Sequence, residues 1–502
     1  MKRLGNILFF VAIFLLLFII TVQSQYLDYD IWARLIAGMG VVEGHHVLKA
    51  DFLSYTPTHV WYDHEYGSGV IFYCFLKYFG KYSLLILQTI ILFFTFFFVL
   101  KAIEIRGIKR PYNIIFWIIS ILAISRVITP IRCQLFSFLF FAVFLYILEK
   151  AKTGKYKILY LLPLITLLWN NLHGGVVAGL GLTVLYIFGE ILNKNKIKHY
   201  ILAGLSSLAV LIINPWGISY LQFLLSANTM QRTYITEWFG LFSQFQIFNQ
   251  LPFKVFMLLI VFLEIFVLYK ICKQKKAAKE NLKFDKTKYL ILTVTLILSV
   301  CHIKLLPFFV ISGGVFCYED FALLIENKIS KLANIFSYTL IWIIIIAGLA
   351  VNYPCEIPFG AGYYPHREVE FIKQNKLEGN LLSNFGYGSF IAYKLYPQNK
   401  IYMDGRYEEV YNNDLIILLK QFYLIENNWD EILKKYPPDI MILENWYPIY
   451  EKINQEKDWI KAYETEMFGV FIKKELKKEK YIQPTEDVRY YKNTLFDTSV
   501  KF

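Results

Sequence analysis

Cysteine and charged residues are both scarce in this chain, and each scarcity excludes a class of protein. Only six cysteines occur among the 502 residues, and their spacing forms no pairs. This pattern supports neither a disulfide framework nor a zinc site. Charged residues make up 18% of the chain and hydrophobic residues 56%, a balance that excludes a soluble enzyme. The composition predicts a polytopic membrane protein.

A cleavage site for signal peptidase is also missing. The first apolar run, Leu4–Val22, has a basic start but no small-residue motif after it. We therefore expect a retained first helix and about ten further spans, since a helix needs about 20 apolar residues to cross a bilayer. The expected segments are Leu4–Val22, Leu84–Ala102, Asn113–Ile128, Leu135–Leu148, Ile158–Trp169, Val176–Leu192, Tyr200–Ile213, Phe253–Ile271, Tyr289–Val300, Pro307–Ile325 and Ile335–Val351.

Lysine and arginine are concentrated in alternate loops. Basic clusters occur at residues 2–3, 101–110, 150–157, 194–198, 273–288 and 328–331, whereas the other loops carry few basic residues. Positive charge in short loops marks the cytoplasmic side of a membrane, which places the N-terminus in the cytoplasm. An odd number of spans then places the C-terminal domain on the outer, extracytoplasmic side of the plasma (inner) membrane.

The formal net charge of +13 has the same origin. In a soluble protein this excess would suggest a nucleic-acid partner. Here the excess lies in the cytoplasmic loops, where it also attracts anionic lipid head groups. We therefore expect membrane lipids as partners and no nucleic acid.

The composition changes near residue 352, and this change predicts two domains. Residues 1–352 form an all-α transmembrane domain with outer loops at 23–66 and 214–252. Residues 353–502 form a small extracytoplasmic α/β domain, because short apolar runs bounded by Gly or Pro alternate with helical patterns. Its expected strands are Asn380–Ser383, Lys400–Asp404 and Asp439–Glu444, with a hairpin at Trp459–Glu464 and Gly469–Lys474, and its expected helices are His366–Asn375 and Asp414–Leu433.

Two carboxylates, Asp28 and Asp30, follow the first helix directly. In an extended turn they share one side, where they could hold a divalent cation, or one of them could act as general base on an acceptor hydroxyl. The alternative, which the spacing alone favours, is that they cap the next short helix and solvate the membrane surface. Both interpretations predict that the two side chains lie just outside the bilayer.

A His-Glu pair, His64 and Glu65, ends the same outer loop. It could be a catalytic or metal-binding pair, or a hydrogen-bonded pair at the membrane interface. The aromatic residues around it, Trp61, Tyr62 and Tyr66, are expected to anchor the loop in the interface, as aromatic belts do.

Four further candidates fall on the predicted outer side. Arg132 could snorkel to the surface or bind a phosphate with bidentate geometry. His173 lies in the polar turn Asn170–Gly175, where it could pair with a carboxylate. Lys304 could neutralise a phosphate or simply anchor a helix end, and Glu237 adds an acidic group in the second outer loop. No single group is specific, but all of them gather on one side.

The motifs that these residues form resemble those of a large family of uncharacterised bacterial polytopic membrane proteins. That family is similar to the C superfamily of glycosyltransferases, which includes the protein mannosyltransferase and aminoarabinose transferase groups. The resemblance covers nearly the whole chain. It rests on Asp28-x-Asp30-x-Trp32, Asp51-x-x-Ser54-Tyr55-Thr56, Trp61-x-x-His64-Glu65, Arg132-x-Gln134, Asn171-Leu172-His173-Gly174-Gly175, Asn214-Pro215-x-Gly217, Glu237-Trp238, Asn384-x-Gly386-Tyr387-Gly388 and Asp404-Gly405-Arg406.

The resemblance implies a donor, a reaction and roles for several residues. The donor is a polyprenyl-phosphate sugar, and the hexosyl or pentosyl group moves with inversion at the anomeric carbon. Asp30, or else Asp28, is implied as the catalytic base, while Arg132, His173 and Lys304 are implied as contacts of the donor phosphate. The sequence departs from the family pattern where Ala33 and Tyr66 replace tryptophan, and where Lys304 replaces arginine.

The sequence therefore predicts a membrane glycosyltransferase with an extracytoplasmic acceptor. One alternative is a non-catalytic membrane subunit of cell-envelope assembly, whose outer domain binds a partner. Another is a lipid or solute transporter, which should show inverted repeats and ionisable residues in mid-span. Only Glu264 stands out as a mid-span charge in the sequence, and this argues against transport.

Overall fold

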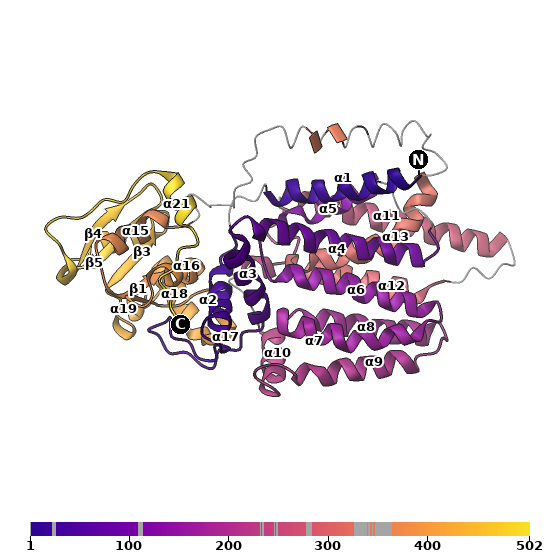
Figure 1. The fold of residues 1–502 in the computed structure, drawn as a ribbon, viewed down its shortest axis with the longest axis horizontal. Coiled ribbons are helices and arrows are strands. Elements are labelled where there is room, and N and C mark those ends of the chain that lie inside the picture. Colours follow the sequence, from indigo (N-terminus) through magenta and orange to yellow (C-terminus); the bar gives the residue numbers. More distant parts are fainter. Residues whose placement is uncertain are drawn as a thin grey trace. The chain divides into compact units, whose positions relative to one another are not determined.

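The computed structural model describes residues 2–22, 27–108, 114–230, 232, 235–244, 246, 249–277, 284–325, 339, 342–343, 345–346 and 364–502. It divides into two compact units (Figure 1). The helical unit comprises residues 1–24 and 85–355, and the sheet unit comprises residues 25–84 and 356–502. The division differs from the one expected at residue 352 because the first outer loop packs with the C-terminal residues. The predicted basic residues at 109–110 and 328–331 lie outside the described residues.

The helices of the helical unit follow the predicted segments closely. The last predicted segment, Ile335–Val351, falls almost wholly outside the described residues. The helices are α1 (Lys2–Val22), α4 (Ser83–Ile105), α5 (Ile114–Ile128), α6 (Gln134–Lys152), α7 (Leu162–Leu172), α8 (Val176–Leu192), α9 (Lys198–Ala209), α10 (Ser219–Thr229), α11 (Leu251–Ala277), α12 (Lys286–Cys301) and α13 (Leu306–Ile325).

Three helices in the described part of the chain are long and apolar enough to cross a membrane. They are Ser83–Ile105, Gln134–Lys152 and Leu251–Tyr269, and five shorter apolar helices accompany them. These helices indicate a multi-pass membrane protein. The expected number of eleven spans stays a prediction, because most of the other helices fall short of the length of about 20 residues that a perpendicular crossing needs.

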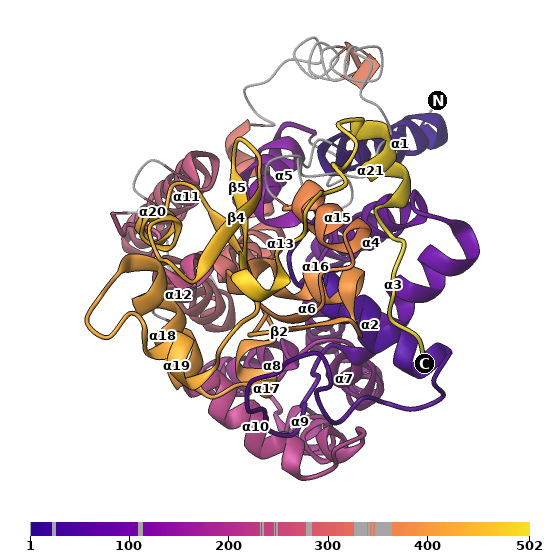
Figure 2. The same ribbon diagram turned by 90° about the vertical axis from the view of Figure 1, so that its left-hand side faces the viewer.

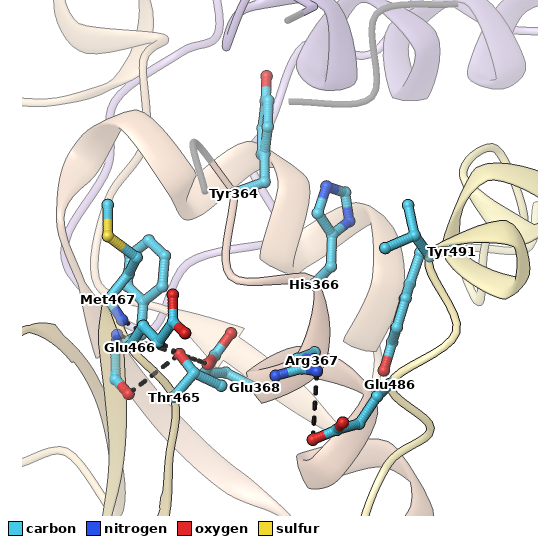
Figure 3. Close-up of a pocket in the computed structure, with 11 residues that line it drawn as sticks. Tyr364, His366, Arg367, Glu368, Thr465, Glu466, Met467, Glu486 and Tyr491 are labelled. Atoms are coloured by element: carbon cyan, nitrogen blue, oxygen red, sulfur yellow. Dashed lines mark hydrogen bonds and ion pairs between the residues drawn. The ribbon is translucent and has the colours of Figure 1, made fainter. Parts of the chain in front are cut away.

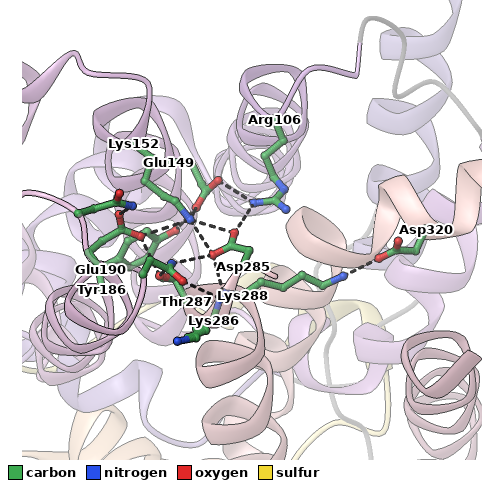
Figure 4. Close-up of polar contacts among 12 residues, drawn as sticks. Arg106, Glu149, Lys152, Tyr186, Glu190, Asp285, Lys286, Thr287, Lys288 and Asp320 are labelled. Atoms are coloured by element: carbon green, nitrogen blue, oxygen red, sulfur yellow. Dashed lines mark hydrogen bonds and ion pairs between the residues drawn. The ribbon is translucent and has the colours of Figure 1, made fainter. Parts of the chain in front are cut away.

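Ion pairs around two buried carboxylates, Glu149 and Glu190, join the ends of α4, α6 and α8 to the start of α12, near the predicted cytoplasmic loops (Figure 4). Lys152 Nζ lies 2.9 Å from Asp285 Oδ2 and 3.4 Å from Glu190 Oε1. Arg106 Nη1 lies 2.9 Å from Glu149 Oε2. Since a buried carboxylate needs a paired cation, these contacts fix the register of the helices.

A second set of charges surrounds Glu264, the residue that the sequence singled out as a mid-span charge. Lys288 Nζ lies 2.8 Å from Glu264 Oε2 and 2.5 Å from Asp320 Oδ2. The three residues come from α11, α12 and α13, so one lysine holds a carboxylate from each neighbouring helix. Figure 4 shows the contact between Lys288 and Asp320. Glu264 is thus paired with a cation inside the helical unit, and this ion pair explains why a charged residue occurs in mid-span.

The sheet unit has five strands in the order β2-β1-β3-β5-β4. The pairs β1–β2 and β1–β3 are parallel, and the pairs β3–β5 and β4–β5 are antiparallel. Figure 2 shows the β4–β5 hairpin. Every residue of β3 is buried, which explains its continuous apolar run. The strands are β1 (Gly379–Ser383), β2 (Asn399–Ile401), β3 (Ile440–Glu444), β4 (Trp459–Glu464) and β5 (Phe468–Lys473).

Helices connect these strands and confirm the predicted small α/β domain near the C-terminus. The expected helix at 414–433 is interrupted, because Ile425 takes the left-handed conformation with φ 53°. The helices are α15 (His366–Gln374), α16 (Phe385–Leu395), α17 (Tyr407–Val410), α18 (Asn413–Leu424), α19 (Glu431–Lys435), α20 (Pro448–Asn454) and α21 (Val488–Thr494).

The sheet unit also contains α2 (Ile31–Val42), within the predicted outer loop 23–66, and α3 (Tyr66–Phe79), which begins where that loop ends. Their backbones touch at two glycines. A Cβ atom on Gly38 would lie 2.3 Å from the Gly69 carbonyl oxygen, and one on Gly69 would lie 2.3 Å from the Arg34 carbonyl oxygen. No residue larger than glycine fits at either position without moving the helices apart. This contact sets the position of the acidic turn that precedes α2.

Candidate functional site

The turn that carries the two predicted catalytic aspartates is fixed by its tryptophan. Trp32 is fully buried, and its Nε1 donates a hydrogen bond to the Tyr364 hydroxyl at 3.2 Å. The Tyr364 hydroxyl in turn donates to the Leu27 carbonyl at 2.9 Å. Rings of α16 and of the C-terminal segment pack around the indole. Residues 27–32 are therefore held by the C-terminal part of the sheet unit.

Asp28 and Asp30 have different surroundings within this turn. Asp28 is buried, and its Oδ1 accepts a hydrogen bond from the Asp30 backbone N–H at 3.1 Å. Asp30 occupies the position before α2, but its side chain makes no capping hydrogen bond. A Cβ on Gly405 would lie 2.4 Å from Asp30 Oδ1, so the Asp30 carboxylate lies against the backbone of the Asp404-Gly405-Arg406 motif. Asp30 therefore does not cap α2 with its side chain, as the alternative interpretation expected.

One helical turn beyond Asp30, Arg34 is surrounded by three carboxylates. Arg34 contacts Asp63 through Nη1. Its Nε lies 3.3 Å from Glu65 Oε2, and its Nη2 lies 2.9 Å from Glu409 Oε2. Arg34, Asp63 and Glu409 are buried, so their charges must compensate one another. The cluster joins α2 and the end of the first loop to α17.

His64 extends this cluster toward the surface. Its Nδ1 lies 3.1 Å from Glu409 Oε1, and its Nε2 lies 3.7 Å from Glu65 Oε1. Burial by itself lowers the pKa of His64, but Glu409 and Glu65 raise it to about 9. Burial raises the pKa of Asp63 to about 7 although Arg34 opposes the shift. The His64–Glu65 pair that the sequence suggested is present in the structure, and it is part of a cluster with Arg34, Asp63 and Glu409.

A second buried ion pair lies beside this cluster. Arg406 Nε donates to Asp404 Oδ1 at 2.8 Å, and Arg406 Nη1 donates to Asp51 Oδ1 at 2.6 Å. The Arg406 guanidinium lies 4.6 Å from the centre of the Trp61 ring, while Trp61 Nε1 donates to Glu409 Oε2 at 2.9 Å. Trp61 is fully buried, so the expectation that it anchors the loop in the membrane interface was wrong. It separates two ion pairs instead.

In the helical unit, Glu237 binds the two predicted phosphate contacts. Arg132 Nη1 lies 2.6 Å from Glu237 Oε2, and Lys304 Nζ lies 2.6 Å from Glu237 Oε1. Burial acts to raise the pKa of Glu237, but the two cations outweigh it and hold the pKa well below its usual range. About a quarter of each side chain is exposed. Three chain segments that are distant in the sequence therefore meet in one accessible charge cluster with an excess of one positive charge.

His173 is attached to the same end of α6. Its Nδ1 lies 2.7 Å from Ser137 Oγ and accepts a hydrogen bond from the Gly175 N–H at 2.9 Å. Because Nδ1 accepts, the neutral imidazole carries its proton on Nε2. Gln134, one turn before Ser137, donates to the Lys304 carbonyl at 3.1 Å. His173 thus pairs with a serine.

Two cavities lie apart from these clusters. The one in the sheet unit has a volume of about 290 Å³ and is lined by aromatic and charged side chains of α15, the β4–β5 turn and the C-terminal segment (Figure 3). The one in the helical unit has a volume of about 320 Å³ and is lined by apolar side chains of α5, α11 and α13. Sequence reasoning indicated neither, because each combines side chains from segments far apart in the chain.

The buried acids of the sheet unit predict a pH dependence of its stability. Burial raises the pKa of Glu368, which lines the cavity in Figure 3, and of Glu444 to about 7, against 4.5 in the unfolded chain. The folded state therefore binds these protons more tightly, so the free energy of unfolding should fall as pH rises from about 4.5 to about 7. Hydrogen exchange of β3 in the full-length protein between pH 5 and pH 8, corrected for the intrinsic exchange rate, measures this change.

Matched variants separate this effect from other causes. Glu444→Gln and Glu368→Gln should each flatten the dependence, because the amide cannot ionise. Glu479→Gln, at an exposed position, should leave it unchanged. An unfolding free energy that rises over this range would contradict the assignment.

Comparison with known proteins places the fold. No family model matches the sequence, and no curated protein matches it either. The structure of the apo form of the oligosaccharyltransferase from Archaeoglobus fulgidus is similar, with a TM-score of 0.55 and 10% identity over 87% of this chain and 69% of that chain. The Archaeoglobus fulgidus oligosaccharyltransferase AglB in complex with an inhibitory peptide and a dolichol-phosphate gives a TM-score of 0.51 and 9% identity, over 96% and 77%.

The chain therefore shares the fold of these oligosaccharyltransferase structures. This confirms, at the level of the fold, the resemblance that the motifs carried. The predicted roles of Asp28, Asp30, Arg132, His173, Lys304, His64, Glu65 and Glu237 stay predictions. What the structure establishes is their grouping. Arg132, Glu237 and Lys304 meet in the helical unit, while His64 and Glu65 meet Arg34 and Glu409 in the sheet unit.

Proposed function

We propose that this protein is a membrane glycosyltransferase that transfers a hexosyl or pentosyl group from a polyprenyl-phosphate donor to an extracytoplasmic acceptor. The observation that carries the proposal is the backbone fold shared with archaeal oligosaccharyltransferase along most of the chain. One of those enzymes was solved with a dolichol-phosphate bound. Because a fold can host several functions, the residues themselves must supply the rest of the argument.

The charge cluster of the helical unit suits a donor phosphate. Arg132 and Lys304 carry two positive charges against the single negative charge of Glu237, so the cluster has one positive charge to offer. A phosphodiester carries one negative charge, and the leaving phosphate gains a second as the bond to the sugar breaks. Fixed cations stabilise that developing charge without reorganisation. The Nε2 proton of His173 offers a further donor at the same end of α6.

The apolar cavity of the helical unit suits the lipid part of such a donor. It is lined by phenylalanine, leucine and isoleucine side chains and has a volume of about 320 Å³. Its lining offers no hydrogen-bonding side chain, so it favours a hydrocarbon over a polar ligand. A branched isoprenoid chain matches this chemistry.

We assign the acceptor chemistry to Asp30. In the proposed step the acceptor oxygen forms a bond to the anomeric carbon, and the bond from that carbon to the phosphate oxygen breaks. The acceptor hydroxyl gives its proton to the Asp30 carboxylate, and the polyprenyl phosphate leaves. The configuration at the anomeric carbon is inverted. Asp404 and Arg406 take no part, because each is held in a buried ion pair.

The proposal predicts release of polyprenyl phosphate from a lipid-linked sugar. Full-length protein reconstituted in liposomes, supplied with polyprenyl-phosphate-linked hexoses and pentoses and an extract of cell-envelope acceptors, should release free polyprenyl phosphate, measured by mass spectrometry. Arg132→Gln should raise the donor concentration for half-maximal rate by about 10- to 100-fold, because a charge-assisted hydrogen bond to an ionised group contributes roughly 1.5–3 kcal/mol.

Arg126→Gln is the matched control. Arg126 lies at the end of α5 and contacts Asn249, so its loss should leave the donor dependence unchanged. Failure of the wild-type protein to release polyprenyl phosphate from any of these donors would contradict the proposed function. An equal effect of both arginine substitutions would remove Arg132 from the donor site.

A further inference from the structure

Three side chains in the sheet unit have the composition and spacing of a metal site. The ligand atoms of His64, Glu65 and Glu409 all lie within 4.8 Å of one another, and they are the only such group in the described residues. An imidazole nitrogen with two carboxylate oxygens is a ligand set that suits Zn²⁺ or Mn²⁺. The sequence suggested a divalent cation at Asp28 and Asp30. Within the residues that the structure describes, these two aspartates belong to no such group.

The separation of His64 and Glu409 fits a shared ion. Two ligand atoms about 2.1 Å from a tetrahedral metal ion are roughly 3.4 Å apart. His64 Nδ1 and Glu409 Oε1 are 3.1 Å apart, close to this separation. The side chains of His64 and Glu65 are 20% and 15% exposed, whereas Glu409 is buried. An ion can therefore approach from the surface and reach the buried carboxylate.

The charge of the cluster matches a divalent ion. The carboxyl groups of Asp63, Glu65 and Glu409 outnumber the one guanidinium that contacts them, that of Arg34, by three to one. One oxygen of Asp63, Oδ2, is buried without a hydrogen-bond partner. Uncompensated buried charge is costly. A divalent cation removes the excess.

We propose that His64, Glu65 and Glu409 bind one divalent transition-metal ion, with Zn²⁺ as the first candidate and Mn²⁺ as the second. Arg34 and Asp63 compensate the remaining charge beside it. The ion joins the end of the first outer loop to α17, so its role is to stabilise the sheet unit. This inference is independent of sugar transfer, because it rests on the sheet unit alone.

Metal binding to the full-length protein tests the proposal directly. Protein in detergent, freed of any affinity tag and treated with EDTA, should bind one equivalent of Zn²⁺ or Mn²⁺ by titration calorimetry and by metal analysis after gel filtration. Binding should raise the temperature of unfolding. His64→Gln should weaken binding at least tenfold and abolish the thermal shift. His59→Gln, at an exposed position four residues after Tyr55, should bind like the wild type.

Three outcomes would overturn the proposal. The first is an absence of stoichiometric binding of either ion to the wild-type protein, which would leave the cluster as an ion-pair network only. The second is unchanged affinity in His64→Gln, which would place the ion elsewhere. The third is loss of binding in Asp28→Asn with retention in His64→Gln, which would move the site to the acidic turn.

Discussion

Replacement of Asp30 by Asn should reduce the rate of sugar transfer by about 10²–10⁴-fold, the contribution that a positioned general base makes. The amide has nearly the same shape as the carboxylate, and its oxygen still accepts hydrogen bonds. The variant should therefore fold normally and bind the donor with unchanged affinity. Single-turnover release of polyprenyl phosphate, measured beside donor binding, separates the two effects.

Two other aspartates serve as comparisons. Asp28→Asn should have a smaller effect on transfer, because Asp28 already accepts the Asp30 backbone N–H, and an amide oxygen can replace it in that bond. Asp458→Asn, at an exposed position in the sheet unit, should have no effect. Full activity of Asp30→Asn, together with loss of activity in Asp28→Asn, would transfer the role of base to Asp28.

Replacement of Arg406 by Met should destabilise the sheet unit by roughly 3–5 kcal/mol, the cost of removing one partner from a buried ion pair. Arg406 is buried together with Asp404 and Asp51, so its loss leaves two carboxylates without a cation. Arg406→Lys should also destabilise, since one ammonium group cannot make the contacts of a planar guanidinium with two acids and with the Trp61 ring. Chemical unfolding of the full-length protein, followed by hydrogen exchange of β1 and β3, measures the loss.

Arg489→Met is the control, because Arg489 is exposed on α21 and should change the unfolding free energy by less than about 0.5 kcal/mol. If Arg406→Met prevents folding, the triple variant with Asp404→Asn and Asp51→Asn should recover part of the stability, because it removes the uncompensated charges. Stability of Arg406→Met equal to that of the wild type would mean that the ion pair contributes nothing.

Local signals made much of the fold predictable. The strands of the sheet unit were predicted to within about three residues, because Gly or Pro bounds most of the apolar runs. Most helices of the helical unit were predicted from their apolar length alone. Helix α2 was expected only as the short helix that Asp28 and Asp30 could cap. Helix α3 was not among the expected spans, because its 14 residues fall short of the length of about 20 that a crossing needs. The interruption at Ile425 was also missed, since a β-branched residue rarely adopts the left-handed conformation.

The candidate site was predictable in its residue types but not in its partners. His64 and Glu65 stand next to each other in the sequence, so their pairing could be predicted. Glu409 could not be connected to them, because only the tertiary fold brings α17 against the first outer loop. The same is true of Glu237, which the sequence separates widely from both Arg132 and Lys304. Their convergence depends on the packing of helices, which hydropathy does not encode.

The contact between Gly38 and Gly69 has a consequence for tracing distant relatives of this chain. A sequence that carries side chains at both positions cannot build the α2–α3 pair in this form, however well its acidic motif matches, because the two backbones leave no room for a Cβ atom. The glycine pair therefore distinguishes chains that share this architecture from chains that share only the Asp-x-Asp signature. To apply this criterion, a sequence alignment must place both helices in the correct register.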